Sequence, residues 1–353
     1  MIGIKDSILK LDKYFVSQMP VRVKLNQNES PLDIPVKIKE EIFKKLKETS
    51  WNRYPSTSPD SLVRKIGEYT DFSPSGILVG NGSNEMIQTL IFATCDSGDQ
   101  ILTLQPGFSV YKRVSSVMNI GFIEVSLKEN FQFDVDSIIE KGQSAKLVIL
   151  ASPNNPTGTV LTLEEIEEIS KHQDGLVAMD EAYYEFHQET AQELIEKLGN
   201  IVVIRTFSKA LNLAGIRLGY MLGKERIIKE LAKAKLPFSV GIFQQVVGEG
   251  ILENINFFEE SIKKIIKERA RLFSELNKEK NLSPIPSKAN FILFESKDFS
   301  GKDLYKRLYK KGVVLRRFDS PLLKNMLRVT VGKQEENDVF LQNLRDITTG
   351  EIS

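Results

Sequence analysis

One lysine, Lys209, stands where a reactive amine would be useful. It follows an apolar run at 201–204 and two hydroxyl residues, Thr206 and Ser208, and Arg217 comes eight positions later. A lysine at the end of a buried strand is poorly solvated, which favours the neutral amine that attacks a carbonyl carbon. Hydroxyl groups and an arginine are donors that hold a phosphate. The pattern therefore suggests a phosphorylated aldehyde bound to the lysine, with pyridoxal phosphate the obvious candidate. A basic surface loop is the plain alternative.

Other turns could complete such a site. Gly82, Ser83 and Asn84 follow an apolar run and open an expected helix, whose free N–H groups suit a phosphate, although a plain strand-to-helix turn reads the same way. In the turn Pro106-Gly107-Phe108, the ring of Phe108 either stacks on a flat ligand or belongs to the core. Asn155 lies between two prolines in a rigid turn that displays its amide.

Charged residues at strand ends also call for partners. Asp180 ends an apolar run, and a buried carboxylate needs a cation such as a protonated pyridine nitrogen; a helix cap or a lysine pair is the alternative. Tyr183, three residues later, could then reach the phenolic oxygen of the same ring. Arg328 is flanked by apolar residues within a strand pattern, which indicates a bound anion or a structural ion pair. Arg316 ends another expected strand.

Two loops near the start of the chain are open to two interpretations. The segment 24–31 contains three amides, a carboxylate and a proline, so we expect it to lie on the surface or to line a site, with Asn28 and Glu29 as candidates. Tyr54 lies beside an arginine in an aromatic loop at 51–55, where it either contacts a phosphate or belongs to the core.

The elements around these residues alternate between apolar runs and helices. We expect strands at 77–79, 100–104, 122–125, 146–150, 176–179, 201–204 and 218–222, with helices at 84–94, 111–118, 164–172 and 191–198 among those between them. Such repetition predicts an α/β fold with a mostly parallel sheet sandwiched by helices. Ligands of these sheets bind beyond the carboxyl ends of the strands, where the turns described above lie.

The chain is expected to divide into an arm and two domains. Residues 1–35 are predicted to be an extended arm that packs against the small domain and the active site. Residues 36–250 form the large domain, which begins with a helix at 35–49 that places Ile38, Ile42, Phe43 and Leu46 on one face. Residues 251–353 form a smaller α+β domain, helical to about 277 and then with strands at 282–286, 290–294, 312–316 and 327–331 and helices at 303–311 and 335–344.

Composition limits the partners. The 353 residues include 48 basic and 47 acidic side chains, so we expect no nucleic-acid partner. A single cysteine, Cys95, cannot form an internal disulfide and fits a reducing compartment. Five charged residues lie between positions 5 and 13, and no apolar run has membrane-spanning length. We therefore expect a cytoplasmic protein with no membrane partner, and no metal is expected.

Taken together, the motifs resemble the fold-type I pyridoxal-phosphate aminotransferases across nearly the whole chain. They come in the order N-E-x-P, R-Y-P, G-N-G-S-N-E, P-x-aromatic, S-P-N-N-P-T-G, D-E-A-Y, S-K with an arginine eight residues later, and L-R-V-T-V-G. Within that superfamily they look most like the histidinol-phosphate aminotransferases, through residues 25–31 and the region around Arg328. Two departures exist: the usual P-T-Y is Pro106-Gly107-Phe108, which lacks a hydroxyl, and the arm ends in Ser30-Pro31 rather than N-P or Y-P.

The resemblance implies an enzyme that transaminates L-histidinol phosphate with 2-oxoglutarate or glutamate in histidine biosynthesis. Lys209 would bind pyridoxal 5'-phosphate and then act as base and acid in the proton shift. Asp180 would keep the pyridine nitrogen protonated, Asn155 and Tyr183 would bond the phenolic oxygen, and Phe108 would stack on the ring. Catalytic roles would thus fall to Lys209, Asp180 and Tyr183.

The remaining roles follow from the same resemblance. The phosphate would be held by Gly82, Ser83, Asn84, Thr206, Ser208 and Arg217, with Tyr54 reaching in from a second subunit, so a homodimer with composite active sites is implied. Substrate would contact Arg328, Arg316, Asn28 and Glu29. Threonine-phosphate decarboxylases and aromatic aminotransferases share the fold and stay open as alternatives. Effector-sensing halves of transcription regulators also share it, but we expect no winged helix within the first 35 residues.

Overall fold

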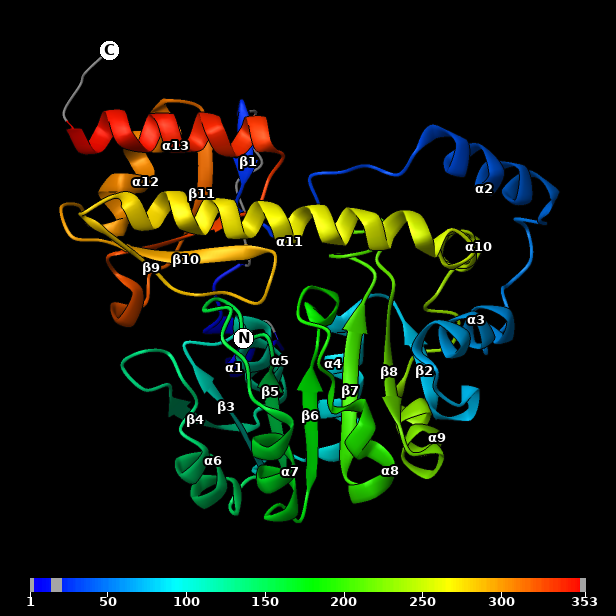
Figure 1. Ribbon diagram of the computed structural model, residues 1–353. Helices are drawn as coiled ribbons and strands as arrows, with labels where there is room; N and C mark the ends of the chain where they lie inside the picture. The colour runs from blue at the N-terminus through cyan, green and yellow to red at the C-terminus, as the bar shows by residue number, and fades with distance from the viewer. Residues whose placement is uncertain (1–2, 14–20, 350–353) are drawn as a thin grey trace.

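The structure, a computed structural model, describes residues 3–13 and 21–349 (Figure 1). The larger of its two sheets contains β2 (Ile77–Gly80), β3 (Gln100–Gln105), β4 (Gly121–Ser126), β5 (Leu147–Ala151), β6 (Leu176–Asp180), β7 (Ile201–Thr206) and β8 (Gly219–Gly223). Their order is β2-β8-β7-β6-β5-β3-β4, and only β8 runs against its neighbours. The mostly parallel sheet expected from the sequence is confirmed, each strand lying within two residues of its predicted run.

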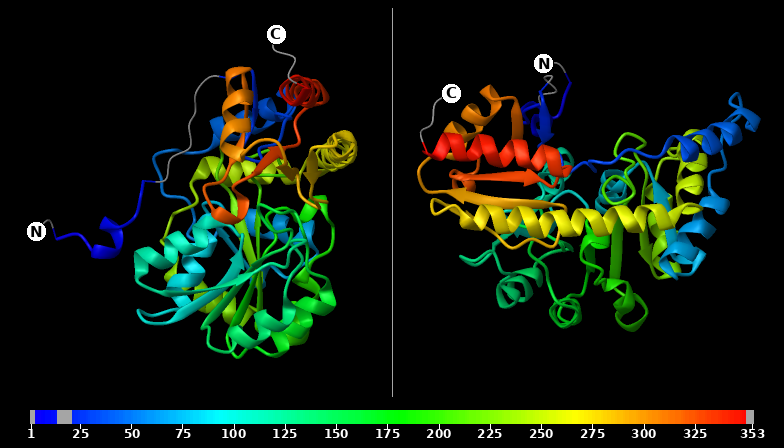
Figure 2. Two further views of the ribbon diagram at one scale, coloured as in Figure 1. Left: turned by 90° about the vertical axis from the view of Figure 1, so that its left-hand side faces the viewer. Right: turned by 45° about the horizontal axis from the view of Figure 1, so that its top comes forward.

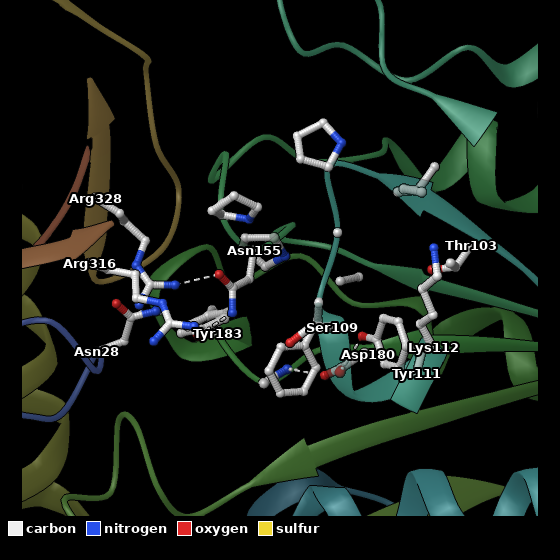
Figure 3. Close-up of a pocket in the computed structure, with 18 of the residues that line it drawn as sticks. Asn28, Thr103, Ser109, Tyr111, Lys112, Asn155, Asp180, Tyr183, Arg316 and Arg328 are labelled. Atoms are coloured by element: carbon white, nitrogen blue, oxygen red, sulfur yellow. Dashed lines mark hydrogen bonds between the residues drawn. The ribbon is translucent and has the colours of Figure 1, made fainter. Parts of the chain in front are cut away.

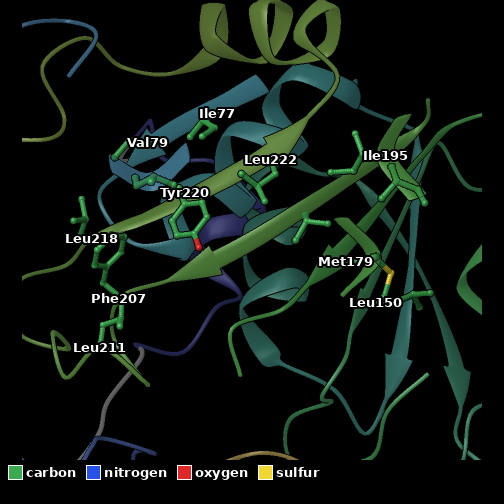
Figure 4. Packing of buried hydrophobic residues seen from close by; sticks show 14 of the residues in the cluster. Ile77, Val79, Leu150, Met179, Ile195, Phe207, Leu211, Leu218, Tyr220 and Leu222 are labelled. Atoms are coloured by element: carbon green, nitrogen blue, oxygen red, sulfur yellow. The ribbon is translucent and has the colours of Figure 1, made fainter. Parts of the chain in front are cut away.

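Helices cover both faces of this sheet because its strands are apolar on both sides. On β5, Leu147 and Ile149 pack with helices α4 (Ser83–Thr94), α5 (Ser109–Met118) and α9 (Glu225–Ala234). Val148 and Leu150 pack on the other face with α3 (Asp60–Thr70), α6 (Val135–Gly142), α7 (Leu163–Lys171), α8 (Ile195–Leu198) and α10 (Ile242–Leu252). Figure 4 shows part of this second layer, to which Leu150 on β5, Met179 on β6, and Tyr220 and Leu222 on β8 contribute from one face of the sheet.

The smaller sheet packs over the carboxyl ends of the larger one (Figures 1 and 2). It contains β1 (Val23–Leu25), β9 (Leu282–Pro284), β10 (Phe291–Ser296), β11 (Val313–Arg317) and β12 (Met326–Thr330), in the order β1-β11-β12-β10-β9. Helices α12 (Gly301–Lys310) and α13 (Gln334–Thr349) accompany it, and α11 (Ile255–Lys278) runs along both parts of the molecule. The boundary expected at residue 250 falls in the last turn of α10.

Two sequence expectations for the first 50 residues are wrong. The arm is not extended throughout, because it contains the short helix α1 (Asp6–Leu9), although the strand β1 is extended and pairs in parallel with β11. On α2 (Val36–Glu48), Ile38, Ile42 and Leu46 are buried, whereas Phe43 is 57% exposed. Phe43 follows Ile42 directly, and one residue turns a helix by about 100°, which takes the ring off the buried face.

None of the helices in the described part of the chain combines the length and the apolar composition needed to cross a membrane.

Candidate active site

A cavity of about 480 Å³ lies between the carboxyl ends of β3, β5, β6 and β7 and the strands β11 and β12. Its position is the one that ligands take in open α/β sheets. Thirteen of the sixteen residues singled out from the sequence line it: Asn28, Ser83, Asn84, Phe108, Asn155, Asp180, Tyr183, Thr206, Ser208, Lys209, Arg217, Arg316 and Arg328. Figure 3 shows six of these side chains converging from the two sheets and the arm: Asn28, Asn155, Asp180, Tyr183, Arg316 and Arg328. Gly82, Glu29 and Tyr54 do not line the cavity.

Lys209 lies three residues beyond the end of β7, with its side chain in the cavity. Its Nζ donates a hydrogen bond to the carbonyl oxygen of Gln27 at 3.1 Å. Burial, together with the positive charges of Arg328 and Arg217, lowers the pKa of this amine to about 7, although the negative charges of Glu29 and Asp180 act in the opposite direction. Near neutral pH a substantial fraction of the amine is therefore unprotonated and nucleophilic.

Asp180 is buried at the end of β6, where it faces the same cavity. Burial raises its pKa, while two hydrogen bonds lower it: one from the hydroxyl of Tyr111 at 2.6 Å and one from the N–H of Ala182 at 3.1 Å. The nearby Lys209 also lowers it. A cationic ligand group would offset the cost of burying this carboxylate.

An amide network joins the arm, the large sheet and the small sheet at the middle of the cavity (Figure 3). The Tyr183 hydroxyl accepts hydrogen bonds from Asn28 Nδ2 at 2.8 Å and from Asn155 Nδ2 at 3.4 Å. The side-chain oxygen of Asn155 accepts one from Arg328 at 2.5 Å. Asn28 is itself fixed by Thr330, whose hydroxyl accepts from its N–H at 2.9 Å. The two asparagine amides and the phenol are therefore held in defined directions.

One end of the cavity is lined by hydrogen-bond donors. Ser83 and Asn84 form the first turn of α4, whose free N–H groups and dipole attract anions. Arg217 donates to Ser208 Oγ at 3.0 Å and to the carbonyl of Ala214 at 3.1 Å. Gly82 has a φ of +80°, and a Cβ on it would lie 2.6 Å from the Arg217 guanidinium. Gly82 thus borders the site by letting that guanidinium approach the backbone.

Two cations face the opposite end. Arg316 on β11 and Arg328 on β12 are directly opposite each other in the antiparallel ladder, and both line the cavity. Like charges in that position repel. Arg328, which is 6% exposed, also donates to the carbonyl of Asn26 at 3.0 Å. An anionic ligand group between the two guanidinium groups would relieve their repulsion.

The other two residues lie away from the cavity. Glu29 forms an ion pair with Lys24 and is two-fifths exposed. Tyr54 is 83% exposed and stacks on Phe238 with ring centroids 4.7 Å apart, so the core alternative is wrong for it. Phe108 combines both predicted locations: its half-buried ring lines the cavity and also packs against the buried cluster that contains Tyr111.

Sequence reasoning missed functional neighbours of the predicted residues. The sequence pattern places Tyr111 only in a helix, whereas its hydroxyl donates to Asp180. Gln27 and Asn26 act through their carbonyl oxygens, which no side-chain pattern reveals. The amide-rich composition of the arm was the only available signal for those two residues.

These groups fit pyridoxal phosphate. The end of the cavity near α4 offers backbone N–H groups, hydroxyls and the Arg217 guanidinium to a phosphate. Lys209 lies where an aldehyde could reach it, and buried Asp180 can pair with a protonated ring nitrogen. Because Gly82 has no side chain, the Arg217 guanidinium can lie close to the N-terminus of α4, where both can contact the same anion.

The family follows from comparison with known proteins. The model of the family "aminotransferase class I and II" matches residues 20–344, and the chain belongs to this family of pyridoxal-phosphate-dependent enzymes. A histidinol-phosphate aminotransferase from Clostridium kluyveri is 36% identical over 97% of this chain and 98% of its own. The crystal structure of one from Clostridium acetobutylicum is 27% identical, with a TM-score of 0.86 over 93% of this chain and 99% of that one. The crystal structure of one from Sinorhizobium meliloti in complex with pyridoxal 5'-phosphate has a TM-score of 0.91 at 20% identity. The match covers 100% of this chain and 99% of that one.

Proposed function

We propose that this chain transaminates L-histidinol phosphate with 2-oxoglutarate, using pyridoxal phosphate carried on Lys209. One observation carries the proposal: a single cavity joins an amine whose pKa is lowered to about 7, a donor-lined end, and paired arginines at the other end. The name of the relative that is 36% identical supports the choice of substrate and a place in histidine biosynthesis.

When bound, pyridoxal phosphate supplies an aldehyde that condenses with amines and a ring that accepts electrons. Lys209 moves the proton to and from the amine-bearing carbon of the substrate. Asp180 would stabilise a proton on the ring nitrogen, and that cation would offset the cost of burying the carboxylate. Asn155 and Tyr183 would hold the ring through its phenolic oxygen, and Phe108 would stack on its face.

Anchoring groups surround these. Ser83, Asn84, Thr206, Ser208 and Arg217, with the backbone of Gly82, hold the cofactor phosphate. At the other end Arg328 and Arg316 serve both half-reactions, because a guanidinium pair accepts a carboxylate from glutamate or a phosphate from histidinol phosphate. In the arm, Asn28 would contact the imidazole from the cavity wall. Glu29, which does not line the cavity, would act on the site through its charge, as it does on Lys209.

We further propose a cytoplasmic homodimer with shared active sites. Trp51 packs on Phe243 and Tyr54 stacks on Phe238, and all four rings are more than 40% exposed. Such a group of exposed aromatic residues is typical of a protein–protein contact. Tyr54 would reach the cofactor phosphate of the second subunit from this contact.

A half-reaction screen tests the substrate. The enzyme loaded with pyridoxal phosphate is mixed in turn with L-histidinol phosphate, L-glutamate, L-phenylalanine and L-threonine O-3-phosphate, and the loss of its visible absorbance is followed. We expect the first two to react fastest and to yield the corresponding carbonyl products by mass spectrometry. Release of carbon dioxide from the threonine compound, without a reaction of histidinol phosphate, would assign a decarboxylase. Preference for phenylalanine would assign an aromatic aminotransferase. Borohydride reduction should fix the cofactor on Lys209.

A further inference from the structure

A buried ion pair lies directly behind the residues that face the cavity. Successive side chains of a strand point to opposite faces, so Asp180 and Thr206 face the cavity, while their neighbours Glu181 and Arg205 point to the other side of the sheet. The side chains of Glu181 and Arg205 are each 2% exposed. Neither residue lines the cavity, and the function proposed above does not use them.

The pair links three segments. Arg205 donates from Nε to Glu181 Oε2 at 3.0 Å and from its terminal nitrogen to the Thr190 hydroxyl at 2.6 Å. That hydroxyl lies 2.8 Å from Glu181 Oε2, and the N–H of Ala191 donates to Glu181 Oε1 at 2.7 Å. The guanidinium also lies over the ring of Tyr184, 3.8 Å from its centroid. Thus β7, the loop after β6 and residues 190–191 are tied together.

Stability alone is a poor explanation for this arrangement. Two charges lose their hydration when they are buried, and replacing a buried pair with well-packed apolar groups is often neutral or stabilising. The position of the pair offers a better one. Glu181 lies between Asp180 and Tyr183, and Arg205 precedes Thr206, Ser208 and Lys209 by one to four residues. Any shift of one strand end against the other would move the proposed ring-binding groups relative to the lysine.

We propose that Glu181 and Arg205 are positioning residues that fix Asp180 and Tyr183 relative to Lys209. This positioning role rests on one part of the proposed function, namely that Lys209 carries pyridoxal phosphate and Asp180 contacts its ring nitrogen. It does not depend on the identity of the amino substrate. Because Tyr184 stacks on the guanidinium and precedes Glu185, the Arg205 fork also restrains the segment that follows Tyr183.

Other ionisable groups surround the pair and define the measuring conditions. Glu185 is buried nearby, and burial raises its pKa to about 7. Its Oε1 lies 3.5 Å from the hydroxyl of Tyr69, and Tyr220 lies opposite Arg205 on β8. The charges of Arg205 and Glu181 both act on this pKa, so the titration of Glu185 differs between the variants and the wild type. The visible band of the bound cofactor is therefore followed at every pH, because it reports on the cofactor rather than on Glu185.

The test separates positioning from stability. In the double variant Glu181→Gln/Arg205→Met, the introduced amide can still bond Thr190 and Ala191, and the methionine fills apolar space, so we expect a melting temperature near that of the wild type. If the pair positions the site, we expect kcat to fall about 10- to 100-fold with little change in KM. A displacement of reacting groups by about 1 Å has an effect of this size on reaction rates in enzymes generally. The visible absorbance of the loaded enzyme is also titrated against pH, and we expect its midpoint to move upward by at least half a pH unit. A ring nitrogen that Asp180 holds poorly carries less positive charge. It therefore repels a proton on the nitrogen of Lys209 less strongly, and the pKa of that nitrogen rises.

A matched control breaks another arginine pair. Arg271 contacts Glu268 and Asp338 on the outer side of α11 and α13. Arg271→Met should leave both the midpoint and kcat unchanged. A double variant that folds and keeps the wild-type midpoint and kcat overturns the proposal. If the double variant does not fold, the same measurements are made on Arg205→Lys, which keeps the positive charge but loses the planar guanidinium. A shifted midpoint in this variant supports positioning, and a wild-type midpoint overturns it. If wild-type protein mixed with cofactor shows no visible band, the proposed function fails instead.

Discussion

The amine of Lys209 makes the stability of the cofactor-free protein depend on pH. Burial lowers its pKa from 10.5 to about 7, so between these values the unfolded chain binds more protons at this site than the folded one. The contribution of Lys209 to the free energy of unfolding therefore rises with pH across that window. Below pH 7 the lysine is protonated in both states and its burial is fully unfavourable.

The variant Lys209→Met should reveal this contribution. Without cofactor at pH 7, we expect it to be more stable than the wild type by roughly 1–3 kcal/mol, because no charge has to be buried. The difference should shrink as the pH rises towards 10. Chemical denaturation of both proteins at several pH values measures it, and groups common to both cancel. A difference that is constant from pH 7 to pH 10 would show that the amine keeps its ordinary pKa.

Asp180→Asn should separate cofactor binding from catalysis. The amide still contacts the ring but cannot stabilise its positive charge, so we expect the cofactor to stay bound while the rate falls by about 10²–10³. The visible spectrum reports the bound cofactor, and single-turnover kinetics with glutamate report the rate. A variant within threefold of the wild type would exclude Asp180 as the partner of a ring cation.

Among single residues, the sequence identifies those at the ends of strands better than the residues that hold them in place. Asp180 and Lys209 follow apolar runs, so their chemistry is visible from local context. Tyr111 lies 69 residues before Asp180, and Arg205 looks like one more residue of an apolar strand. Their contacts depend on how strands and helices meet, which no local pattern records.

Among the elements, the start of α4 depends on the absence of a side chain at Gly82. An alanine there would adopt a backbone conformation that is nearly exclusive to glycine and would displace Arg217. We expect Gly82→Ala to weaken the binding of pyridoxal phosphate about 10- to 100-fold, as the loss of a charge-assisted hydrogen bond does. Equilibrium dialysis or fluorescence titration of the cofactor-free protein measures this.

Gly98 supplies the control. It also has a positive φ, +102°, but a Cβ there would meet no atom within 4 Å. Gly98→Ala should therefore destabilise the fold by roughly 1–3 kcal/mol through backbone strain and leave cofactor affinity unchanged. Equal losses of affinity in both variants would mean that strain, and not the contact with Arg217, is responsible.

The strands of the large sheet could be predicted from the sequence because they are buried on both faces, so that each appears as a continuous apolar run. Strand β1 escaped detection: its three residues alternate between buried and exposed, and its partner β11 is far away in the chain. Helix α2 was located correctly, but its buried stripe is narrower than its apolar composition suggests, which is why Phe43 was misplaced.

For the whole molecule, the position of Tyr54 on the surface leads to a complementation test. Tyr54→Phe subunits are mixed with Lys209→Ala subunits at limiting cofactor, each weakened or inactive alone. If Tyr54 serves the neighbouring subunit, a mixed dimer has one site with both lesions and one with neither. It should therefore recover about half the activity of a wild-type dimer, since the lost hydrogen bond costs about 10- to 100-fold in affinity.

Subunit exchange must be shown independently, for example by native mass spectrometry. If mixed dimers form and activity does not recover, Tyr54 acts within its own chain or not at all.

The pairing of β1 with β11 also orders events during synthesis. Val23 is made about 290 residues before its partner Val313. At roughly 5–20 residues per second, the arm waits on the order of 15–60 s on the ribosome before its strand can pair. Asn28 follows β1, and its contacts to Thr330 and Tyr183 form only after that pairing. The amide network of the cavity therefore cannot assemble on a newborn chain until Thr330 has been translated.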